Sequence, residues 1–594
     1  MGKNAYIDLL VHATHEAGVK VGGIGAVLDG LLSAHAYTEH VSRTVLVGPM
    51  DTQNPEEMER LTSPRNRLEI AYSSYHTIDG LDTSLGNHIR RIEQQHNVRI
   101  LYGARAFGAA RHEVILVDGR YAAPEQVNAF KGQLYDRFGI QSDRYEYNPE
   151  FAIYINAALP SFEVLEAVAG DVGPNRWLIA HEFMGLPFCY CAMLNVPGVW
   201  HTVFYGHEVT TARPIVEFHS GHDTMFYNVM AQAREQGRYL EDVFGDQSGF
   251  FKHALVKPAV EHCDRIFAVG DRVVQEMRFL GDAWARARID LVYNGVPSVE
   301  IALDDKKAAQ NKLKQYSENL LAFWPDYVFS HVTRFIPSKG LWRDLRVMEH
   351  LDALLAERRQ TALFFVLSSV IPMGRSPRAV QAMEAAYGWP VTHRESTIHV
   401  DGTDVPDLVA HETPFYHAVE AFNWQARASK IVLVNQFGWS QDRCGLRMPA
   451  EMQFMDIRQG TDLEFGQSIY EPFGIAQLEP LSFGALCVVS NVCGCVGFVD
   501  RVGGSAMPNV IVADYTDAGV LGQSAEAALS IDQVQRNEIE VQQAGLVARQ
   551  IVQRLPQDDL AAQKLLVDGY ALGQKMSWEV VARDYLLPGL EWIE

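Results

Sequence analysis

Residues 471–479 read Glu-Pro-Phe-Gly-Ile-Ala-Gln-Leu-Glu, and the fold assignment depends on this stretch. It places two carboxylates eight positions apart, with Glu471 in a turn and Glu479 in the helix that the turn opens. The apolar run 486–490 that follows Gly484 is typical of a buried strand. Two carboxylates at this spacing can bind the two ends of one extended polar ligand. The alternative is a capped surface helix with two unrelated acids.

A pair of cations lies in a second loop, at the end of a strand predicted over residues 327–334. Arg334 and Lys339 are five residues apart across a turn that contains Pro337. A planar guanidinium fork and an ammonium point charge can converge on one diphosphate at this spacing. Two solvated surface charges are the alternative.

Two polar features follow predicted strands in the first half of the chain. Residues 20–23 read Lys-Val-Gly-Gly and open a helix, where the backbone amides of Gly22 and Gly23 can approach a phosphate. The loop fits neither the dinucleotide fingerprint nor the Walker pattern, so a plain strand-to-helix turn is an equal alternative. His181 ends a strand predicted over 177–180 and precedes Glu182. A single histidine in such a place is more often structural.

In this order the motifs resemble those of retaining, nucleotide-sugar-dependent glycosyltransferases of the GT-B architecture, in the glycogen and starch synthase group. The resemblance rests on the Lys-x-Gly-Gly loop, His-Glu, Arg-x4-Lys, Glu-x7-Glu and a closing helix with Ser-Trp-Glu at 577–579. Weaker matches lie at 202–207, which ends in His207, at Arg213 and at 491–497. The animal and fungal glycogen synthases are closest in pattern at residues 470–474. Their arginine-rich regulatory helix has no counterpart here, and residues 373–462 are foreign to the pattern.

The resemblance implies a role for each matched side chain. The cations would neutralise the leaving diphosphate, the first Glu and the adjoining backbone would hold the donor sugar, and the second Glu would hold the ribose. The residues assigned to catalysis are His181, Glu471, Arg334 and Lys339. The residues assigned to substrate binding are Lys20, Gly22, Gly23, Phe473, Gly474, Ile475 and Glu479. Because the chain contains no Asp-x-Asp triplet, we expect no required metal and no other cofactor.

The function that the resemblance implies is retaining transfer of glucose to a carbohydrate acceptor, favouring UDP-glucose as donor and an α-glucan as acceptor. The sequence does not decide between UDP- and ADP-linked donors. One rival is a retaining synthase of the sucrose or trehalose type, which acts on a small acceptor. Another is a catalytically silent carbohydrate-binding homologue. A phosphorylase is disfavoured because no lysine has a convincing pyridoxal-binding context.

Short apolar strands alternate with helical periods along most of the chain, which predicts an α/β fold. We expect two Rossmann-like, doubly wound parallel-sheet domains that face a cleft. The first covers 1–300 and the second 301–575, with an insertion near 373–462, and a helix at 576–594 crosses back to the first domain. Helices are predicted at 24–37, 274–280 and 300–325. Strands are predicted near 5–11, 44–47, 99–102, 113–117, 177–180, 202–205, 265–269, 290–293, 327–334, 362–367, 431–434, 486–490 and 509–512.

Composition limits the partners and the location. The 594 residues carry a net charge of −22, which disfavours nucleic acid and anionic membranes as principal partners. Seven cysteines lie mostly in apolar runs, as expected for small buried residues in a reducing compartment. The chain starts with a predicted strand instead of a signal peptide, and it contains no uninterrupted apolar run of about 18 residues. We therefore expect a cytoplasmic protein without membrane insertion; homo-oligomerisation is left open.

Overall fold

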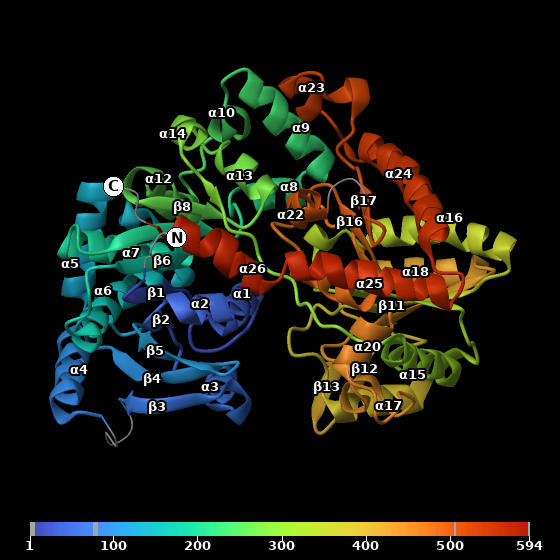
Figure 1. The fold of residues 1–594 in the computed structure, drawn as a ribbon, viewed down its shortest axis with the longest axis horizontal. Helices are drawn as coiled ribbons and strands as arrows, with labels where there is room; N and C mark the ends of the chain where they lie inside the picture. Colours follow the sequence, from blue (N-terminus) through green and yellow to red (C-terminus); the bar gives the residue numbers. More distant parts are fainter. Residues whose placement is uncertain (1–5, 75–80, 504–506, 592–594) are drawn as a thin grey trace. The chain divides into compact units, whose positions relative to one another are not determined.

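The computed structural model describes residues 6–74, 81–503 and 507–591. It contains two compact units (Figure 1). Unit 1 comprises Met1–Ala212, Gln236–Gly295 and Trp578–Glu594, and unit 2 comprises Arg213–Glu235 and Val296–Ser577. Each unit is built on a largely parallel sheet with helices, which confirms the predicted α/β fold class. Ala5, the first residue of the predicted strand 5–11, and residues 592–594 of the closing helix lie outside the described residues.

The sheet of unit 1 has the strand order β3-β4-β5-β2-β1-β6-β7-β8-β9. The strands are β1 (Leu9–Ala13), β2 (Thr44–Pro49), β3 (Leu68–Ser73), β4 (Arg99–Phe107), β5 (Ala110–Asp118), β6 (Arg176–His181), β7 (His201–Gly206), β8 (Arg265–Ala268) and β9 (Asp290–Leu291). At one edge the sheet departs from the predicted parallel arrangement, because β3 pairs with β4 and β4 with β5 in antiparallel fashion. Only Gly108 and Ala109 join β4 to β5, and so short a loop can only form a hairpin.

The helices of unit 1 flank this sheet (Figure 1). Their bounds are α1 (Gly23–Ser33), α2 (His35–His40), α3 (Pro55–Thr62), α4 (Thr83–His96), α5 (Pro124–Phe138), α6 (Pro149–Ala169), α7 (Glu182–Asn195), α10 (Leu240–Phe244), α11 (Phe251–Val256), α12 (Ala259–His262), α13 (Asp271–Met277) and α14 (Asp282–Arg286). The helix predicted at 24–37 is two helices, because Ala34 adopts an extended conformation between them. Among the described residues, α6 is the one helix whose length and mean hydropathy of 1.3 would allow it to cross a membrane. It packs on α7, α4 and β5 as a core helix.

The sheet of unit 2 is parallel, with the strand order β14-β11-β10-β15-β16-β17. These strands are β10 (Tyr327–Val332), β11 (Ala362–Leu367), β14 (Ser429–Val434), β15 (Leu463–Gly466), β16 (Leu486–Ser490) and β17 (Val510–Ala513). Side chains alternate between two hydrophobic cores, one on each face. Phe329 lies in the core with α16 (Leu341–Arg358) and α24 (Gln533–Arg554). Val328 lies in the core with α15 (Leu303–Leu321) and α17 (Pro377–Tyr387).

Residues 373–462, predicted to contain an insertion, contribute one strand to the main sheet. β14 pairs along its whole length with β11 and forms one edge of the main sheet. Outside the sheet the segment forms α17, the hairpin of β12 (Thr397–Val400) and β13 (Thr403–Pro406), α18 (Thr413–Gln425), α19 (Gln441–Cys444) and α20 (Phe454–Gly460). The sequence prediction did not include β15, a strand of four residues that immediately precedes the Glu471 turn.

Residues 213–235 belong to unit 2, although the sequence placed them in the first domain. The reason is a buried ion pair between α9 (His222–Glu235) and α16. Both guanidinium Nη atoms of Arg343 donate to the carboxylate of Asp223, at 2.9 and 2.6 Å, and its Nε donates to Glu540 at 2.9 Å. All three side chains are fully buried. Removing either acid would leave the guanidinium under-compensated, so this network holds α9 on unit 2.

The chain ends on unit 1, as the predicted crossover requires. α25 (Asp559–Lys575) lies in unit 2, and the segment that starts with α26 (Trp578–Val581) is grouped with unit 1. Glu579 accepts hydrogen bonds from the backbone N–H groups of His35 and Ala36, at 2.8 and 2.9 Å. The Trp578 ring lies against Gly30 in α1 and against Gly295. Two contacts therefore hold this segment on unit 1. The Glu579 carboxylate binds the first backbone amides of α2, and the Trp578 indole packs on two glycines.

The contact with Trp578 predicts opposite effects for one substitution at two mid-helix glycines. A Cβ at Gly30 would lie 2.2 Å from the Trp578 ring, whereas a Cβ at Gly132 in α5 would meet nothing within 4 Å. We expect Gly132→Ala to raise stability by about 0.5–1 kcal/mol through helix propensity. Gly30→Ala should instead lower it by about 1–3 kcal/mol through overpacking. Thermal unfolding of both variants measures this; equal gains in Tm would contradict the packing of Trp578.

Candidate active site

Each sheet reverses its strand order at one place. In unit 2 the chain continues from β10 through β11 to β14 on one side and from β15 through β16 to β17 on the other. In unit 1 the same reversal lies between β1 and β6. The loops that leave the carboxyl ends of two such strands diverge, and ligands of open α/β sheets bind there. All the site residues predicted from the sequence lie at or after the carboxyl ends of β1, β6, β10 and β15.

In unit 2 the structure brings Lys339 and Glu471 together. The Lys339 ammonium donates a short hydrogen bond to Oε2 of Glu471, and both side chains are mostly buried. Gln477 supports the carboxylate, because its Nε2 donates to Ser468 Oγ at 2.9 Å and lies 3.4 Å from Glu471 Oε2. Arg334 is exposed and has no ion-pair partner among the described residues of unit 2. The predicted cation and the predicted sugar-binding acid are thus neighbours on two loops.

The Glu471–Glu479 stretch forms a tighter structure than the single helix predicted from its sequence. α21 (Ile475–Leu478) is followed directly by a 3-10 helix at Glu479–Phe483, because Pro480 cannot donate the next α-helical hydrogen bond. Gly474 has φ +97°, a conformation that favours glycine. Phe473 and Gly474 are buried and Ile475 is half-buried.

The loop at 491–497 packs on this turn. Gly494 N–H donates to the Glu471 carbonyl, and Cys495 N–H donates to the Phe473 carbonyl, each at 2.9 Å. A Cβ at Gly494 would lie 1.7 Å from the Pro472 carbonyl, so only glycine fits at this approach. The carbonyls of Glu471 and Phe473 are therefore already bonded inside the protein.

Glu479 has a partner that sequence reasoning did not find. Arg458, fully buried in α20, places Nε 3.1 Å from Glu479 Oε2 and Nη1 3.1 Å from Glu464 Oε1. Arg458 also donates to the Ala476 carbonyl in α21. Glu464 in turn accepts from the backbone N–H of Val332 at 2.9 Å. The guanidinium thus ties the second motif acid to β10 and β15, and no local pattern around residue 458 signals this.

In unit 1 the glycine-rich loop is closed by an acid of its own. The buried carboxylate of Glu16 accepts hydrogen bonds from the N–H groups of Val21 and Gly22, at 2.6 Å each. The predicted contact of the Gly22 amide with a phosphate therefore meets an amide that is already bonded. Gly23 begins α1, and no side chain caps this helix terminus. The Lys20 ammonium Nζ lies 3.1 Å from Oδ2 of Asp29.

Both ring nitrogens of His181 are bonded to other histidines. Its Nε2 lies 2.8 Å from His12 Nδ1, and its Nδ1 lies 2.8 Å from His207 Nε2. Burial, reinforced by the neighbouring histidines, lowers the pKa of His12 and of His181 well below the usual value. The sequence placed His181 against the donor sugar; in this structure its imidazole has no nitrogen left for such a bond.

Glu182 is held in a strained conformation next to these histidines. Its φ is +63°, which is unfavourable for a residue with a Cβ. Oε1 accepts from the N–H groups of His207 and Glu208, while Oε2 is buried without a partner. Burial, with the nearby Glu208, raises the pKa of Glu182 to about 8. The clamp on residues 207 and 208 keeps His207 in place against His181.

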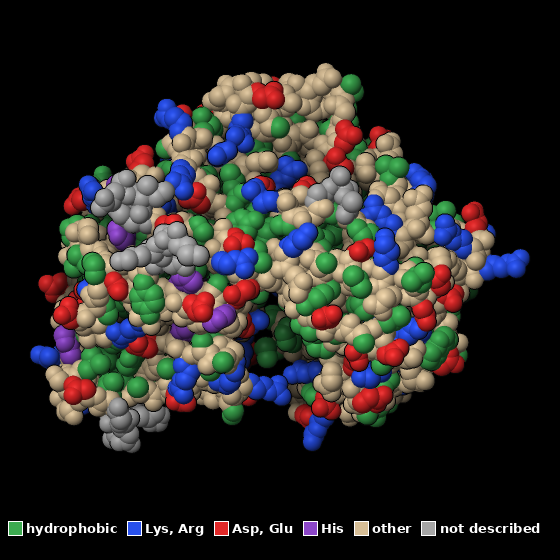
Figure 2. Space-filling model, in the orientation of Figure 1, with side chains coloured by type: hydrophobic (Ala, Val, Ile, Leu, Met, Phe, Trp, Pro, Cys, Tyr) green, Lys and Arg blue, Asp and Glu red, His purple; other side chains and the backbone are tan. Residues whose placement is uncertain are grey.

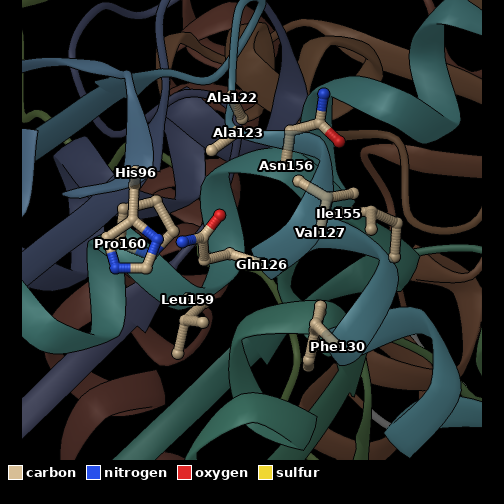
Figure 3. Close-up of a pocket in the computed structure, with 10 residues that line it drawn as sticks. All are labelled: His96, Ala122, Ala123, Gln126, Val127, Phe130, Ile155, Asn156, Leu159 and Pro160. Atoms are coloured by element: carbon tan, nitrogen blue, oxygen red, sulfur yellow. The ribbon is translucent and has the colours of Figure 1, made fainter. Parts of the chain in front are cut away.

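Two cavities lie away from the predicted site residues. On the face that Figure 2 shows, basic and acidic side chains are intermixed over both units. Figure 3 shows a cavity of about 10 Å³ in unit 1, lined mostly by apolar side chains of α5 and α6. A second hollow of about 360 Å³ lies beside Phe162 and Glu166. Neither is lined by a residue of the predicted site.

Comparison with known proteins places the chain near several solved structures of low identity. No protein-family description and no curated protein matches it. The catalytic domain of starch synthase IV from Arabidopsis thaliana, bound to ADP and acarbose, is 14% identical over 96% of this chain and 100% of that chain, with a TM-score of 0.47. An α,α-trehalose-phosphate synthase (UDP-forming) from Burkholderia xenovorans, in complex with glucose-6-phosphate, is 10% identical over 98% and 99%, with a TM-score of 0.48. Sucrose-phosphate synthase from Thermosynechococcus elongatus is 13% identical over 97% and 96%, with a TM-score of 0.42.

None of these three proteins is an animal or fungal glycogen synthase, so that finer resemblance stays a prediction.

The raised pKa of Glu182 predicts a pH-dependent stability. Between about pH 4.5 and 8 the folded protein holds a proton on Glu182 that the unfolded chain releases, so stability falls as the pH rises. The slope from this group is at most about 1.4 kcal/mol per pH unit. Glu182→Gln keeps the Oε1 acceptor and cannot ionise.

We therefore expect the Tm of Glu182→Gln to rise relative to wild type between pH 5.5 and 8. Glu69→Gln is the matched control, because Glu69 is exposed and its ion pair with Arg111 lowers its pKa. Parallel pH profiles for wild type and Glu182→Gln would contradict a protonated Glu182.

Proposed function

We propose that this chain is a retaining glycosyltransferase that moves glucose from a nucleoside diphosphate sugar to a carbohydrate acceptor. UDP-glucose is the favoured donor and an α-glucan the favoured acceptor. The observation that carries the proposal is the contact between Lys339 and Glu471 at the point where the strand order of unit 2 reverses. A cation for the diphosphate and an acid for the sugar are adjacent at the edge where α/β sheets bind ligands.

The chemistry asks the protein chiefly to stabilise negative charge on the departing diphosphate. Arg334, exposed and without an ion-pair partner among the described residues of its unit, and Lys339 supply that charge from one loop. Glu471 would bind the donor sugar, and Glu479, oriented by Arg458, would bind the ribose. In the family resembled, the transfer proceeds on one face of the sugar and the leaving phosphate oxygen takes the acceptor proton. Such a step needs no protein nucleophile.

A synthase that acts on a small acceptor is the second candidate. The names of the similar structures cover both acceptor classes, starch on one side and trehalose phosphate or sucrose phosphate on the other, and do not choose between them. The third candidate is a catalytically silent carbohydrate-binding homologue. In such a protein the polar groups at the β10 and β15 loops would bind a carbohydrate without transferring it.

Charge removal in unit 2 tests the proposal. We expect Lys339→Ala and Arg334→Ala each to lower kcat by about 10²–10³-fold, since each removes a group that stabilises charge in the transition state. Lys564→Ala and Arg378→Ala are matched controls, because both side chains are about three-quarters exposed in the same unit. Release of nucleoside diphosphate measures turnover. Wild-type rates in the first pair would remove these cations from the mechanism.

A donor and acceptor panel separates the candidates. UDP- and ADP-linked sugars are each offered with glycogen, glucose, glucose-6-phosphate and fructose-6-phosphate, and nucleoside diphosphate release is scored. Transfer to glycogen alone supports the α-glucan acceptor, and transfer to a monosaccharide supports the small-acceptor synthase. Binding of a donor without release in any combination would support the silent homologue and contradict the enzyme.

Metal independence is a further expectation. If Arg334 and Lys339 supply the charge that a divalent cation supplies in other glycosyltransferases, transfer should proceed in excess EDTA at a rate within about twofold of the untreated enzyme. Loss of activity on chelation and its return with Mg²⁺ or Mn²⁺ would contradict the assignment of that role to the two cations.

A further inference from the structure

Five side chains of unit 1, with His181 among them, form one continuous row of hydrogen bonds. The row begins at Thr44 Oγ1, which is 2.8 Å from the Tyr37 hydroxyl. That hydroxyl is 3.0 Å from His12 Nε2, and the two His181 contacts of 2.8 Å continue the row to His207. His12 lies in β1, His181 ends β6 and His207 follows β7, so the row crosses three adjacent strands near their carboxyl ends.

The three imidazoles all point the same way along the row. Nδ1 of His12 faces Nε2 of His181, and Nδ1 of His181 faces Nε2 of His207. His12 and His181 are fully buried, and burial lowers the pKa of His207 to about 3, so all three rings are neutral at physiological pH. A neutral ring has one N–H and one lone pair. Two neighbouring rings can share a hydrogen bond only if the protonated nitrogen of one meets the lone pair of the other.

The row therefore has only two self-consistent arrangements of protons. In one, every ring carries its proton on Nδ1, and the hydrogen bonds run from Thr44 through Tyr37 towards His207. In the other, every ring carries its proton on Nε2, and the bonds run from His207 towards Thr44. The arrangements differ at the two ends. In the first, His207 Nδ1 is a donor; in the second it is an acceptor, and the Thr44 hydroxyl must find an acceptor of its own.

The surroundings of Thr44 favour the first arrangement. Thr44 is buried, and its hydroxyl has no partner other than Tyr37 among the described residues. In the second arrangement its proton would point at no acceptor, and a buried donor left unsatisfied is unfavourable. In the first arrangement Thr44 donates to Tyr37 and Tyr37 donates to His12, so every buried proton is bonded. The unpaired end is then Nδ1 of His207, which is half-buried and has no partner among the described residues.

We propose that Tyr37 and His12 are positioning residues that fix His207 as a hydrogen-bond donor at the ligand-binding edge of unit 1. They act through His181, whose two bonded nitrogens transmit the direction of the row. Glu182 holds the backbone of His207 in register. The group that His207 Nδ1–H recognises is an uncharged oxygen acceptor such as a sugar hydroxyl, because a neutral imidazole contributes no charge towards a phosphate. This assignment of the ligand rests on the proposed function.

The direction of the row can be measured without any ligand. In the full-length protein with 15N-labelled histidine, long-range 1H–15N spectra distinguish protonated from unprotonated ring nitrogens. The signals are assigned from His12→Gln, His181→Gln and His207→Gln variants. We expect Nδ1 to be protonated and Nε2 unprotonated in all three residues. Protonation of Nε2 in any of them would overturn the proposal.

Two hydroxyl deletions and one control identify what sets the direction. Tyr37→Phe removes the donor to His12, so the row should lose its single direction and show mixed tautomers at His207. Thr44→Val removes a hydroxyl that only donates to Tyr37, and Tyr37 can still donate to His12. The wild-type tautomers should therefore persist, and a change to protonated Nε2 would overturn the proposal. Tyr205→Phe is the matched control, because this equally buried tyrosine packs on His181 and His207 but donates to the Val292 carbonyl. A Tyr37→Phe spectrum identical to wild type would also overturn it.

Steady-state kinetics test whether the row of hydrogen bonds contributes to binding of the sugar. Tyr37→Phe should lower kcat/KM for transfer by about tenfold, the worth of one hydrogen bond, while Tyr205→Phe stays within about twofold of wild type. Equal losses in both variants would mean that the row is only structural. If wild type transfers no sugar, the proposed function fails, whereas the tautomer measurement still decides the direction of the row.

Discussion

The reversal of strand order in each sheet is the constraint on which the rest of the structure depends. Parallel strands need crossover connections, and where the crossovers turn to opposite sides, two neighbouring loops separate at the carboxyl ends of the strands. In unit 2 these loops follow β10 and β15, and in unit 1 they follow β1 and β6. Motifs that are more than a hundred residues apart in sequence, such as Lys339 and Glu471, meet for this reason.

Most of the polar groups at these edges already have partners inside their own unit. Lys339 is paired with Glu471, Lys20 with Asp29, and the Gly22 amide with Glu16. In a chain with a net charge of −22, most cations have an acid nearby, and ion pairs within each unit hold Lys339 and Lys20 in place. A diphosphate would then exchange one ion pair for another. Its selectivity would come from the geometry that Gln477 and Arg458 impose on the acids.

Buried charge also decides where chain segments belong. Arg343 with Asp223 and Glu540 has no contact with water, and it attaches α9 to a unit that is otherwise formed by later sequence. Arg213, which starts this segment, lies over the ring of Tyr470, the residue before the first motif acid. The segment therefore brings a cation of the first half of the sequence to the Glu471 turn.

The sequence by itself determined the fold class and the loops that carry the motifs, because continuous apolar runs and glycine turns are local signals. β11 and β16 have the bounds predicted for them, and the Glu471 turn, the Arg334 loop and the Gly22 loop all follow strands as expected. The sequence did not reveal the antiparallel edge of unit 1, β15, or the transfer of residues 213–235 to unit 2.

The sequence also did not predict the hydrogen-bond and ion-pair partners of the motif residues. His12 and Arg458 lie outside any motif, and only the close approach of strands and helices makes them neighbours of His181 and Glu479. A hydrogen bond between side chains 169 positions apart, such as that of His12 with His181, leaves no local trace in the sequence. Tertiary packing alone decided those pairs, and with them the proton arrangement and the charge balance of the candidate site.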